Sequence, residues 1–285
     1  MTESFPDKTE KLECGAVIQH GSLSERVYLM KLAGADTQQL LPELDRLVRQ
    51  NKYGKIFAKI PASSYRIFEE WGFEKEAFIP RFYNGSEDAM FLGKYYDPAR
   101  KIETQKDKYD EIGKITIAKS AEKPQADKHL KIRLCTTDDV EEMAQLYRDV
   151  FPSYPFAIYD PEYLRHTMAE HIVYFCIEHD GRIVALSSAE MDTEAQNVEM
   201  TDFATLPQMR GAGYAKHLLD NMESNMRSRG MITTYTIARA ISAGINIIFA
   251  RAGYSFGGRL VNNTNISGNI ESMNVWYKTF RTNRS

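Results

Sequence analysis

A turn of six residues, 210–215, carries the clearest chemistry in this chain of 285 residues. Its sequence is Arg-Gly-Ala-Gly-Tyr-Ala, and it lies between a predicted strand that ends near Leu206 and a predicted amphipathic helix. The two glycines allow the backbone to curl, so that successive N–H groups converge where the helix begins. Unpaired donors and the helix dipole favour an anion there. The sequence therefore predicts a phosphate-binding turn.

Two common phosphate-binding motifs do not fit this turn. The dinucleotide-binding fingerprint requires a third glycine where Lys216 stands, and it occurs early in a βαβ unit. The P-loop motif requires Gly-Lys followed by Ser or Thr, and no such sequence follows Gly213. As an isolated motif the turn is also compatible with an ordinary helix start, so the surrounding elements must decide.

The elements predicted around the turn form an α/β domain with a mixed sheet in the second half of the chain. An antiparallel meander with a turn at Asp180-Gly181 precedes the motif, and apolar residues at helical spacing follow it. We expect a polar loop over 262–268. The predicted strands cover 131–134, 173–178, 183–190, 198–206, 231–237, 258–261 and 273–277, and the predicted helices cover 213–229 and 242–252, with another that begins after Thr137 or Asp138.

The first half shows a smaller α/β pattern in the order β-α-β-α-β-β. Between the halves, over about residues 97–129, Lys, Glu, Asp and Gln dominate. We therefore expect a domain over 1–100, a charged connector over 101–128 that holds a short strand or helix, and the main domain over 129–285. The predicted strands of the first half cover 27–32, 55–61, 76–79 and 89–95, and its helices carry Leu40 to Val48 and Tyr65 to Trp71.

The composition limits the partners. With 43% hydrophobic residues the chain is not disordered throughout, and a formal net charge of −3 argues against a nucleic-acid-binding surface. The three cysteines and six histidines show no metal-ligand spacing, so we expect no metal. No leader-like segment and no apolar run of about 18 residues occurs. We expect a cytoplasmic protein that binds a small molecule, without a nucleic acid or a membrane; a homodimer is compatible with the sequence.

In this context the turn resembles that of the GNAT superfamily of acyl-CoA-dependent N-acetyltransferases. The shared pattern is a strand meander, Arg-x-x-Gly-x-Ala at the start of a long helix, and a second helix that ends in Ala252-Gly253-Tyr254. The resemblance covers about residues 131–280, and it implies a mixed, mostly antiparallel sheet flanked by helices, with acetyl-CoA as co-substrate. The coenzyme-binding residues that it implies are Phe203, Ala204, Thr205, Arg210, Gly211, Ala212, Gly213, Tyr214, Ala215, Asn246 and Phe249.

The first half is similar to a degenerate GNAT half. Residues 68–73 parallel residues 249–254, because both place an aromatic residue, a helix end and a Gly-aromatic pair before two strands. The first half lacks the Arg-x-x-Gly-x-Ala turn. We therefore expect it to be a supporting domain that does not bind the coenzyme in the same way.

Segments along the whole chain look like the β-lysine N-acetyltransferases. They are Gly15–Gly21, Phe82–Gly85, Met200–Thr205 and Leu260–Ile266. Members of this group acetylate the terminal amine of β-lysine (3,6-diaminohexanoate), and the product serves some organisms as a compatible solute. The resemblance therefore implies acetyl transfer to N6 of β-lysine. The alternatives are another diamine, a polyamine or a protein lysine as acceptor, or a catalytically silent module that senses an acyl-CoA or an amine.

Acetylation of an alkyl amine requires a proton acceptor, because an amine with a pKa of about 10.4 is almost wholly protonated at pH 7. Glu199 stands where GNAT enzymes often place a base that acts through water, and it is the first candidate. Asp202 follows three residues later, so it points to the opposite face of a regular strand unless a bulge intervenes. It is the second candidate, as a base or as an anchor for the ammonium group.

The proton donor for the departing thiolate stays open. Many GNAT enzymes place a tyrosine in the second helix, where this chain has Phe249. Either the thiolate leaves unaided, or the hydroxyl of Tyr214 or Tyr254 substitutes. The asparagine that the family places at the start of that helix aligns with Ser242, and Asn246 one turn later is a replacement.

A zwitterionic diamino acid needs a cation for its carboxylate and polar acceptors for its inner amine. The resemblance does not assign these contacts, so the candidates come from residue type and position. The substrate-binding candidates are Tyr159, Arg239, Asn262, Asn263 and Asn265, with Arg251, Tyr154 and Phe156 in addition.

Overall fold

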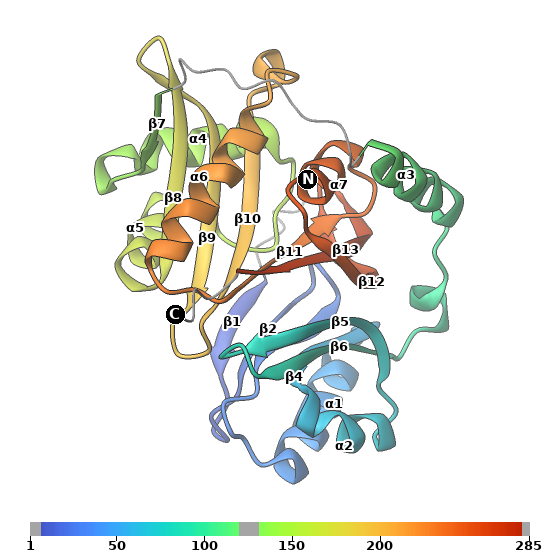
Figure 1. Ribbon diagram of the computed structural model, residues 1–285. Helices are drawn as coiled ribbons and strands as arrows, with labels where there is room; N and C mark the ends of the chain where they lie inside the picture. The colour runs from blue at the N-terminus through green and yellow to red at the C-terminus, as the bar shows by residue number, and fades with distance from the viewer. Residues whose placement is uncertain (1–6, 120–130, 281–285) are drawn as a thin grey trace.

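The computed structural model describes residues 7–119 and 131–280, and its strands form one continuous sheet (Figure 1). The strands are β1 (Lys8–Lys11), β2 (Val17–Gly21), β3 (Arg26–Lys31), β4 (Lys55–Pro61), β5 (Glu74–Tyr83), β6 (Glu87–Tyr95), β7 (Lys131–Leu134), β8 (Ile172–His179), β9 (Arg182–Asp192), β10 (Asn197–Thr205), β11 (Thr233–Arg239), β12 (Ser255–Ile266) and β13 (Asn269–Thr279). Their order is β1-β2-β3-β4-β6-β5-β12-β13-β11-β10-β9-β8-β7. The pairs β3–β4 and β10–β11 are parallel and the other described pairs are antiparallel, so the predicted mixed, mostly antiparallel sheet is confirmed.

Helices cover this sheet in separate groups. They are α1 (Thr37–Asn51), α2 (Tyr65–Glu70), α3 (Lys106–Lys119), α4 (Val140–Val150), α5 (Pro161–Glu170), α6 (Tyr214–Ser228) and α7 (Ala243–Arg251). In the N-terminal half, which we define as residues 7–101, α1 and α2 cover one face of β3 and β4. In the C-terminal half, residues 131–280, α6 and α7 cover one face, and α4 and α5 cover the other (Figure 1). The core beneath α4 and α5 continues into the space between the halves, where it includes Tyr28, Phe57 and Phe91.

The sequence prediction omits β1 and β2, which pair with each other and extend the sheet from β3. β2 buries two polar residues, Gln19 and His20, and therefore lacks the apolar run of a typical buried strand. The Gln19 amide donates to the carbonyl oxygen of Pro155 at 2.9 Å, and the His20 ring bonds to Glu10 at 2.9 Å. Partners elsewhere in the chain thus make possible a burial that the local pattern does not reveal.

The predicted polar loop over 262–268 is wrong. β12 continues through this segment to Ile266, and a two-residue turn joins it to β13. Ser267 and Gly268 form the turn with φ values of 55° and 87°. Two successive positive φ values match the right-handed twist of a hairpin. The polar residues before the turn are therefore strand residues, bonded to groups from other elements.

A close approach of two strands joins the halves. β5 and β12 meet where Gly258 pairs with Ala77. A Cβ atom on Gly258 would lie 2.3 Å from the carbonyl oxygen of Glu76, and its φ of 142° also favours glycine. Beside this point the buried Lys55 ammonium is bound by the Glu76 carboxylate at 2.8 Å and by the Val261 carbonyl oxygen at 2.7 Å. The two parts of the sheet are therefore tied both by backbone contact and by a buried ion pair.

The predicted connector contains helix α3, which lies beside α7 (Figure 1). Tyr109 and Ile112 are buried, and the Arg259 guanidinium lies 5.2 Å from the centre of the Tyr109 ring. Residues 120–128 of the connector lie outside the described residues. α3 thus packs on the C-terminal half, and the domain limits remain a prediction.

Candidate active site

β10 and β11 separate at the centre of the C-terminal half. They pair from Asn197–Thr233 to Glu199–Tyr235, after which β10 continues to Thr205 unpaired with β11. On its other edge β10 remains paired with β9 as far as Thr205. The backbone of β10 beyond Glu199 therefore presents unpaired groups toward the gap, where a ligand can bond to them.

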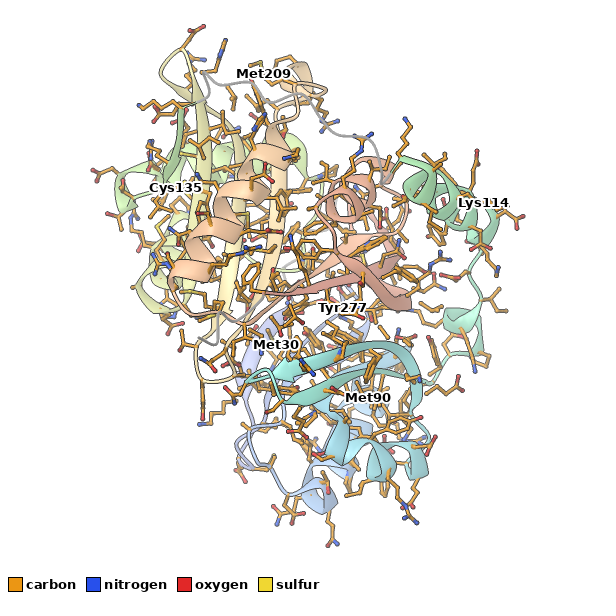
Figure 2. The ribbon with its side chains drawn as sticks, in the orientation of Figure 1. Met30, Met90, Lys114, Cys135, Met209 and Tyr277 are labelled. Atoms are coloured by element: carbon orange, nitrogen blue, oxygen red, sulfur yellow. The ribbon has the colours of Figure 1, made fainter. Side chains whose placement is uncertain are left out.

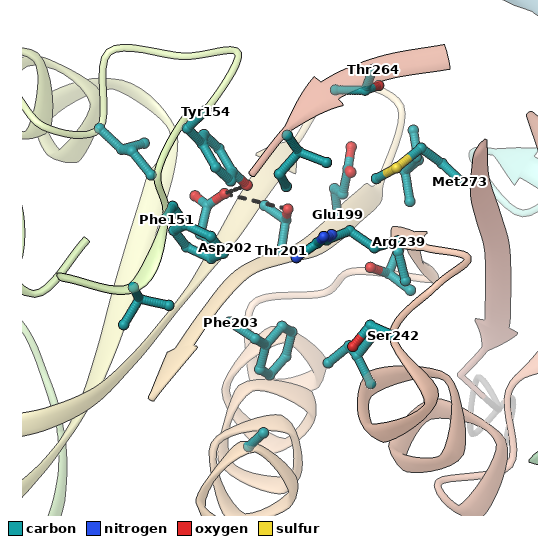
Figure 3. Close-up of a pocket in the computed structure, with 18 of the residues that line it drawn as sticks. Phe151, Tyr154, Glu199, Thr201, Asp202, Phe203, Arg239, Ser242, Thr264 and Met273 are labelled. Carbon is teal, nitrogen blue, oxygen red and sulfur yellow. Dashed lines mark hydrogen bonds between the residues drawn. The ribbon is translucent and has the colours of Figure 1, made fainter. Parts of the chain in front are cut away.

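A bulge in β10 brings both predicted carboxylates to this gap. The register with β9 shifts between Thr201 and Ala204, and Asp202 adopts a φ of 55°. In a regular strand Glu199 and Asp202 would face opposite sides. With the bulge both line the same cavity, as Figure 3 shows. The bulge that Asp202 requires to face the site is thus present, and its role as a base or as an anchor for the ammonium group stays a prediction.

A cavity of about 720 Å³ occupies the gap and extends between the halves. Met209, Gly211 and Gly213 line one end, where α6 begins, and Met30 of β3 lines the other. Figure 2 shows Met209 near the top of the view and Met30 well below it, beside the N-terminal half. The cavity is therefore long enough to join the predicted phosphate-binding turn to the N-terminal half.

The turn before α6 has the geometry of an anion site. Gly211 and Gly213 have φ values of 89° and 78°, and no side chain caps the helix. Within the described residues, no acceptor is assigned to the N–H groups of residues 211–215. These donors, at the positive end of a helix of 15 residues, fit a phosphate or diphosphate group. Of the predicted coenzyme-binding residues, Phe203, Thr205, Arg210, Gly211, Gly213, Tyr214 and Ala215 line the cavity, whereas Ala204 packs in the core and Ala212 is exposed.

Glu199 has the electrostatics of a general base near neutral pH. Burial and the neighbouring Glu190 carboxylate raise the pKa of Glu199 to about 7, while Lys59 and a hydrogen bond with Tyr235 act in the opposite direction. The Lys59 ammonium donates to the Tyr235 hydroxyl at 2.9 Å. A carboxylate with this pKa is partly ionised at pH 7 and is basic enough to accept a proton from an ammonium group.

Glu190 keeps its negative charge beside Glu199. Burial alone would raise the pKa of Glu190, but the nearby His171 ring and the charge of Lys59 outweigh burial and lower it. The His171 ring lies 3.7 Å from the carboxylate. The two glutamates therefore divide their roles, because the stable charge on Glu190 helps to raise the pKa of Glu199.

Asp202 is held by hydroxyl groups. Tyr154 and Ser188 donate to its two carboxylate oxygens, the latter at 2.5 Å, and Thr201 lies at 3.4 Å (Figure 3). Burial raises the pKa of Asp202, and the bonds from Ser188 and Tyr154 lower it. Its lone pairs are therefore largely engaged, which favours a positioning role for Asp202 and leaves Glu199 as the stronger candidate base.

The N-terminal half supplies one wall of the cavity, which the sequence did not predict. Arg26, Tyr28 and Met30 are alternate residues of β3, so they share one face, and Phe57 and Lys59 of β4 lie beside them. The opposite face of β3 packs against α1. No motif marks these residues, because they meet the C-terminal half only after the two parts of the sheet have joined.

Asn246 of α7, a predicted coenzyme-binding residue, bonds only to other groups of the protein. Asn246 is buried, and its amide donates to two backbone carbonyl groups while its oxygen accepts from Asn274 and Trp276, both at 2.8 Å. All of its hydrogen-bonding capacity is thus used within the protein. Among the described residues that line the cavity, α7 instead contributes Ile245 and Ile248.

The position of Phe249 bears on the proton donor. Its ring is fully buried and packs edge-on against Phe203 at 5.7 Å and against Tyr254 at 4.8 Å. Among the described residues, Tyr214 and Ser242 carry hydroxyl groups and line the cavity, whereas Phe249 and Tyr254 do not line it. Of the two tyrosines considered from the sequence, the structure therefore places Tyr214 at the site.

The predicted substrate-binding residues divide into two groups. Arg239 and Asn263 line the cavity. The Arg239 guanidinium is already paired with Glu271, through Nε at 2.8 Å and Nη2 at 2.6 Å. The other three, Tyr159, Asn262 and Asn265, are not among the described residues that line the cavity. The Tyr159 hydroxyl donates to the Phe151 carbonyl oxygen, and the Asn262 amide donates to the carbonyl oxygens of Arg100 and Ile102. The Asn265 side-chain oxygen accepts from Ser153.

Residues 7–119 and 131–280 contain neither a candidate metal site nor a candidate membrane-spanning helix. No group of three or more His, Cys, Asp or Glu side chains in these ranges is arranged to hold a metal ion. None of the helices there has the length and apolar character needed to span a bilayer.

Comparisons with known proteins show which family this chain resembles. The model described as "Acetyltransferase (GNAT) family" matches residues 140–248. The chain is 39% identical over 264 residues to the β-lysine N(6)-acetyltransferase of Methanococcus maripaludis, covering 92% of this chain and 96% of the relative. It is 33% identical over 261 residues to that of Methanosarcina mazei, covering 84% and 96%. Among solved structures, the ribosomal-protein-S18-alanine N-acetyltransferase from Escherichia coli aligns with a TM-score of 0.47 and 14% identity, covering 55% of this chain and 98% of that chain.

Proposed function

This chain belongs to the GNAT family of acetyl-CoA-dependent N-acetyltransferases, and on that premise we propose that it transfers an acetyl group from acetyl-CoA to N6 of β-lysine. The alignment with the Methanococcus maripaludis relative covers 92% of this chain, so it includes the N-terminal half as well as the region that matches the family model. The product is N6-acetyl-β-lysine. We extend the proposal to a cytoplasmic reaction on a small, diffusible substrate.

The single observation that carries this proposal is the continuity of the cavity. It joins the open start of α6, the splayed part of β10 and the wall formed by β3 and β4. The N–H groups of residues 211–215 would bind the diphosphate, and the unpaired edge of β10 would bond to the extended arm of the coenzyme. The thioester would then lie near the bulge at Asp202, with the amine approaching from the N-terminal half.

Glu199 would prepare the amine for attack. Its carboxylate, with a pKa of about 7, accepts a proton from the substrate ammonium group, directly or through water. The neutral nitrogen then attacks the thioester carbonyl carbon, a C–N bond forms and the C–S bond breaks. The departing thiolate takes a proton, for which the hydroxyl groups of Tyr214 and Ser242 are two of the candidate donors that line the cavity. The proton that the nitrogen loses as the amide forms restores that hydroxyl group.

The test is to incubate the purified chain with acetyl-CoA and a panel of amines while following thiol release. The panel contains β-lysine, α-lysine, spermidine, a lysine peptide and no amine. We expect release to be fastest with β-lysine, and NMR of the product to place the acetyl group on N6. A preference for spermidine or the peptide would assign another acceptor, and no release with any amine would indicate a module without catalysis.

A further inference from the structure

Arg26 is a buried cation that lines the cavity without a carboxylate partner. Its side chain lies among the described lining residues although the residue is only 3% exposed. No Asp or Glu of the described residues forms an ion pair with it, and burial lowers the pKa of Arg26 to about 10. The guanidinium also lies 5.2 Å and 5.7 Å from the ring centres of Tyr28 and Phe57. A buried charge of this kind requires a counter-ion or a full set of acceptors.

The hydrogen bonds of Arg26 leave its Nε atom without an acceptor. Nη1 donates to the Asn263 carbonyl oxygen and to Thr264 Oγ1, both at 2.8 Å. Nη2 donates to Gln19 Oε1 at 3.4 Å, and Nε is buried without an acceptor. The same edge, Nε with Nη2, is the one through which Arg239 binds the Glu271 carboxylate. A carboxylate that replaced Gln19 at this edge of Arg26 would therefore be bound in bidentate fashion.

A second unpaired group lies near Arg26. Asn263 is fully buried, lines the cavity and has no donor for its Oδ1 atom among the described residues. Its backbone carbonyl oxygen accepts from Nη1 of Arg26, so the two residues are neighbours. A buried donor and a buried acceptor on neighbouring residues, both without partners, match a ligand that carries a carboxylate and an ammonium group close together.

Of the other cations that line the cavity, four have hydrogen-bond partners. Arg239 is paired with Glu271, the Lys59 ammonium donates to Tyr235, Arg251 donates to the Lys119 carbonyl oxygen, and Arg210 donates to the Thr205 carbonyl oxygen. Arg26 and Glu199 line the same cavity, and the charges of Asp7 and Glu199 both act on the pKa of Arg26. A substrate with its carboxylate at Arg26 would thus extend toward the base.

We propose that Arg26 of the N-terminal half binds the carboxylate of the acceptor, with Asn263 Oδ1 accepting a hydrogen bond from its 3-ammonium group. The N-terminal half would thereby select amino acids with a terminal amine over simple diamines. This inference rests on the proposed acetylation of β-lysine. It assigns to the N-terminal half a role in substrate recognition.

The test compares β-lysine with pentane-1,4-diamine, which differs by loss of the carboxylate. We expect the wild type to prefer β-lysine. In Arg26→Met the KM for β-lysine should rise about 10- to 100-fold, because a charge-assisted bidentate contact is lost. The KM for acetyl-CoA and the kcat/KM for pentane-1,4-diamine should stay within about threefold of the wild type, since neither depends on the carboxylate. Arg26→Lys, which keeps the charge and loses the planar fork, should give a smaller rise and provides a second variant if Arg26→Met does not fold.

Arg100→Met is the matched control. Arg100 is also a buried arginine of the N-terminal half, 7% exposed, and it donates to the carbonyl oxygens of Asn262 and Ser24, but it is not part of the described cavity lining. Its replacement should lower the melting temperature and leave the preference for β-lysine unchanged. An unchanged preference in both Arg26 variants would overturn this inference alone. A wild type that acetylates neither compound would refute the proposed function, and one that acetylates both equally would refute the carboxylate contact.

Discussion

The N-terminal and C-terminal halves connect their elements in the same order, yet the helices at equivalent places begin differently. The order β3-α1-β4-α2-β5-β6 in one half corresponds to β10-α6-β11-α7-β12-β13 in the other. Each half places a parallel pair beside an antiparallel pair, and β5 and β12 meet at the centre of the sheet. The shared topology positions α1 and α6 alike, so the difference between them is one of local sequence.

The helix starts show what that difference does. In α1 the Asp36 carboxylate accepts from the Gln38 N–H at 2.9 Å, so a negative side chain occupies the helix start. In α6 the residue at the same place is Gly213, which has no side chain to cap the helix. A carboxylate cap uses the backbone donors and repels a phosphate, whereas the glycine leaves the donors available. The same topology therefore supports a stable helix in one half and an anion site in the other.

The two parallel strand pairs also differ in the side chains that they present to the cavity. Tyr28 and Phe57 pair in β3–β4 and stack with their ring centres 4.5 Å apart. Glu199 and Tyr235 pair in β10–β11, and the Tyr235 hydroxyl accepts from Lys59 at 2.9 Å. The N-terminal wall thus presents aromatic rings with cations, and the C-terminal wall presents carboxylates. A molecule that carries both a carboxylate and ammonium groups fits between two such walls.

The largest effect is expected for Glu199→Gln, which removes the proposed base from the C-terminal wall. We expect kcat to fall by roughly 10²- to 10⁴-fold at pH 8. In the wild type, kcat/KM should rise with pH and level off above about 7, because Glu199 acts in its deprotonated form and its pKa is about 7. Stopped thiol-release assays from pH 5.5 to 9 measure both the fall in kcat of the variant and the pH dependence of kcat/KM. Glu223→Gln, which changes a buried glutamate of α6 paired with Lys278, is the control and should keep the wild-type pH profile. A Glu199→Gln enzyme with the same profile as the wild type would remove Glu199 from this role.

A smaller effect should follow when the α1 cap is copied into α6. Gly213→Asp places a carboxylate at the α6 start, so we expect the KM for acetyl-CoA to rise about 10- to 100-fold with a smaller change in kcat. Gly230→Asp is the matched control, because Gly230 follows the other end of α6 with φ of 79° against 78° for Gly213. Steady-state kinetics and thermal melts of the two variants separate lost binding from backbone strain. Equal KM values in both would mean that the turn does not contact the diphosphate.

The smallest effect is expected for the reverse experiment in the N-terminal half. Asp36→Ala removes the α1 cap and should lower the free energy of unfolding by about 1 kcal/mol, as measured by urea titration. Asp36→Asn keeps a cap acceptor and should retain most of this stability. The KM for acetyl-CoA should be unaltered in both. A change in that KM would show that the start of α1 also takes part in coenzyme binding.

The sequence by itself determined the local features of this protein. The glycine turn and the amphipathic α6 follow from residue type and spacing, because each depends on neighbours in the chain, and the candidate base Glu199 follows from the resemblance to GNAT enzymes. Only the tertiary structure decided that Asp202 shares the cavity, because the bulge in β10 depends on pairing with β9. Only the tertiary structure placed Arg26 in the same cavity as Glu199, because β3 and β10 lie in different parts of the sheet, which join where β5 and β12 pair. Residues that form a site by such long-range packing carry no local signal, and for this reason the turn could be predicted and the substrate wall could not.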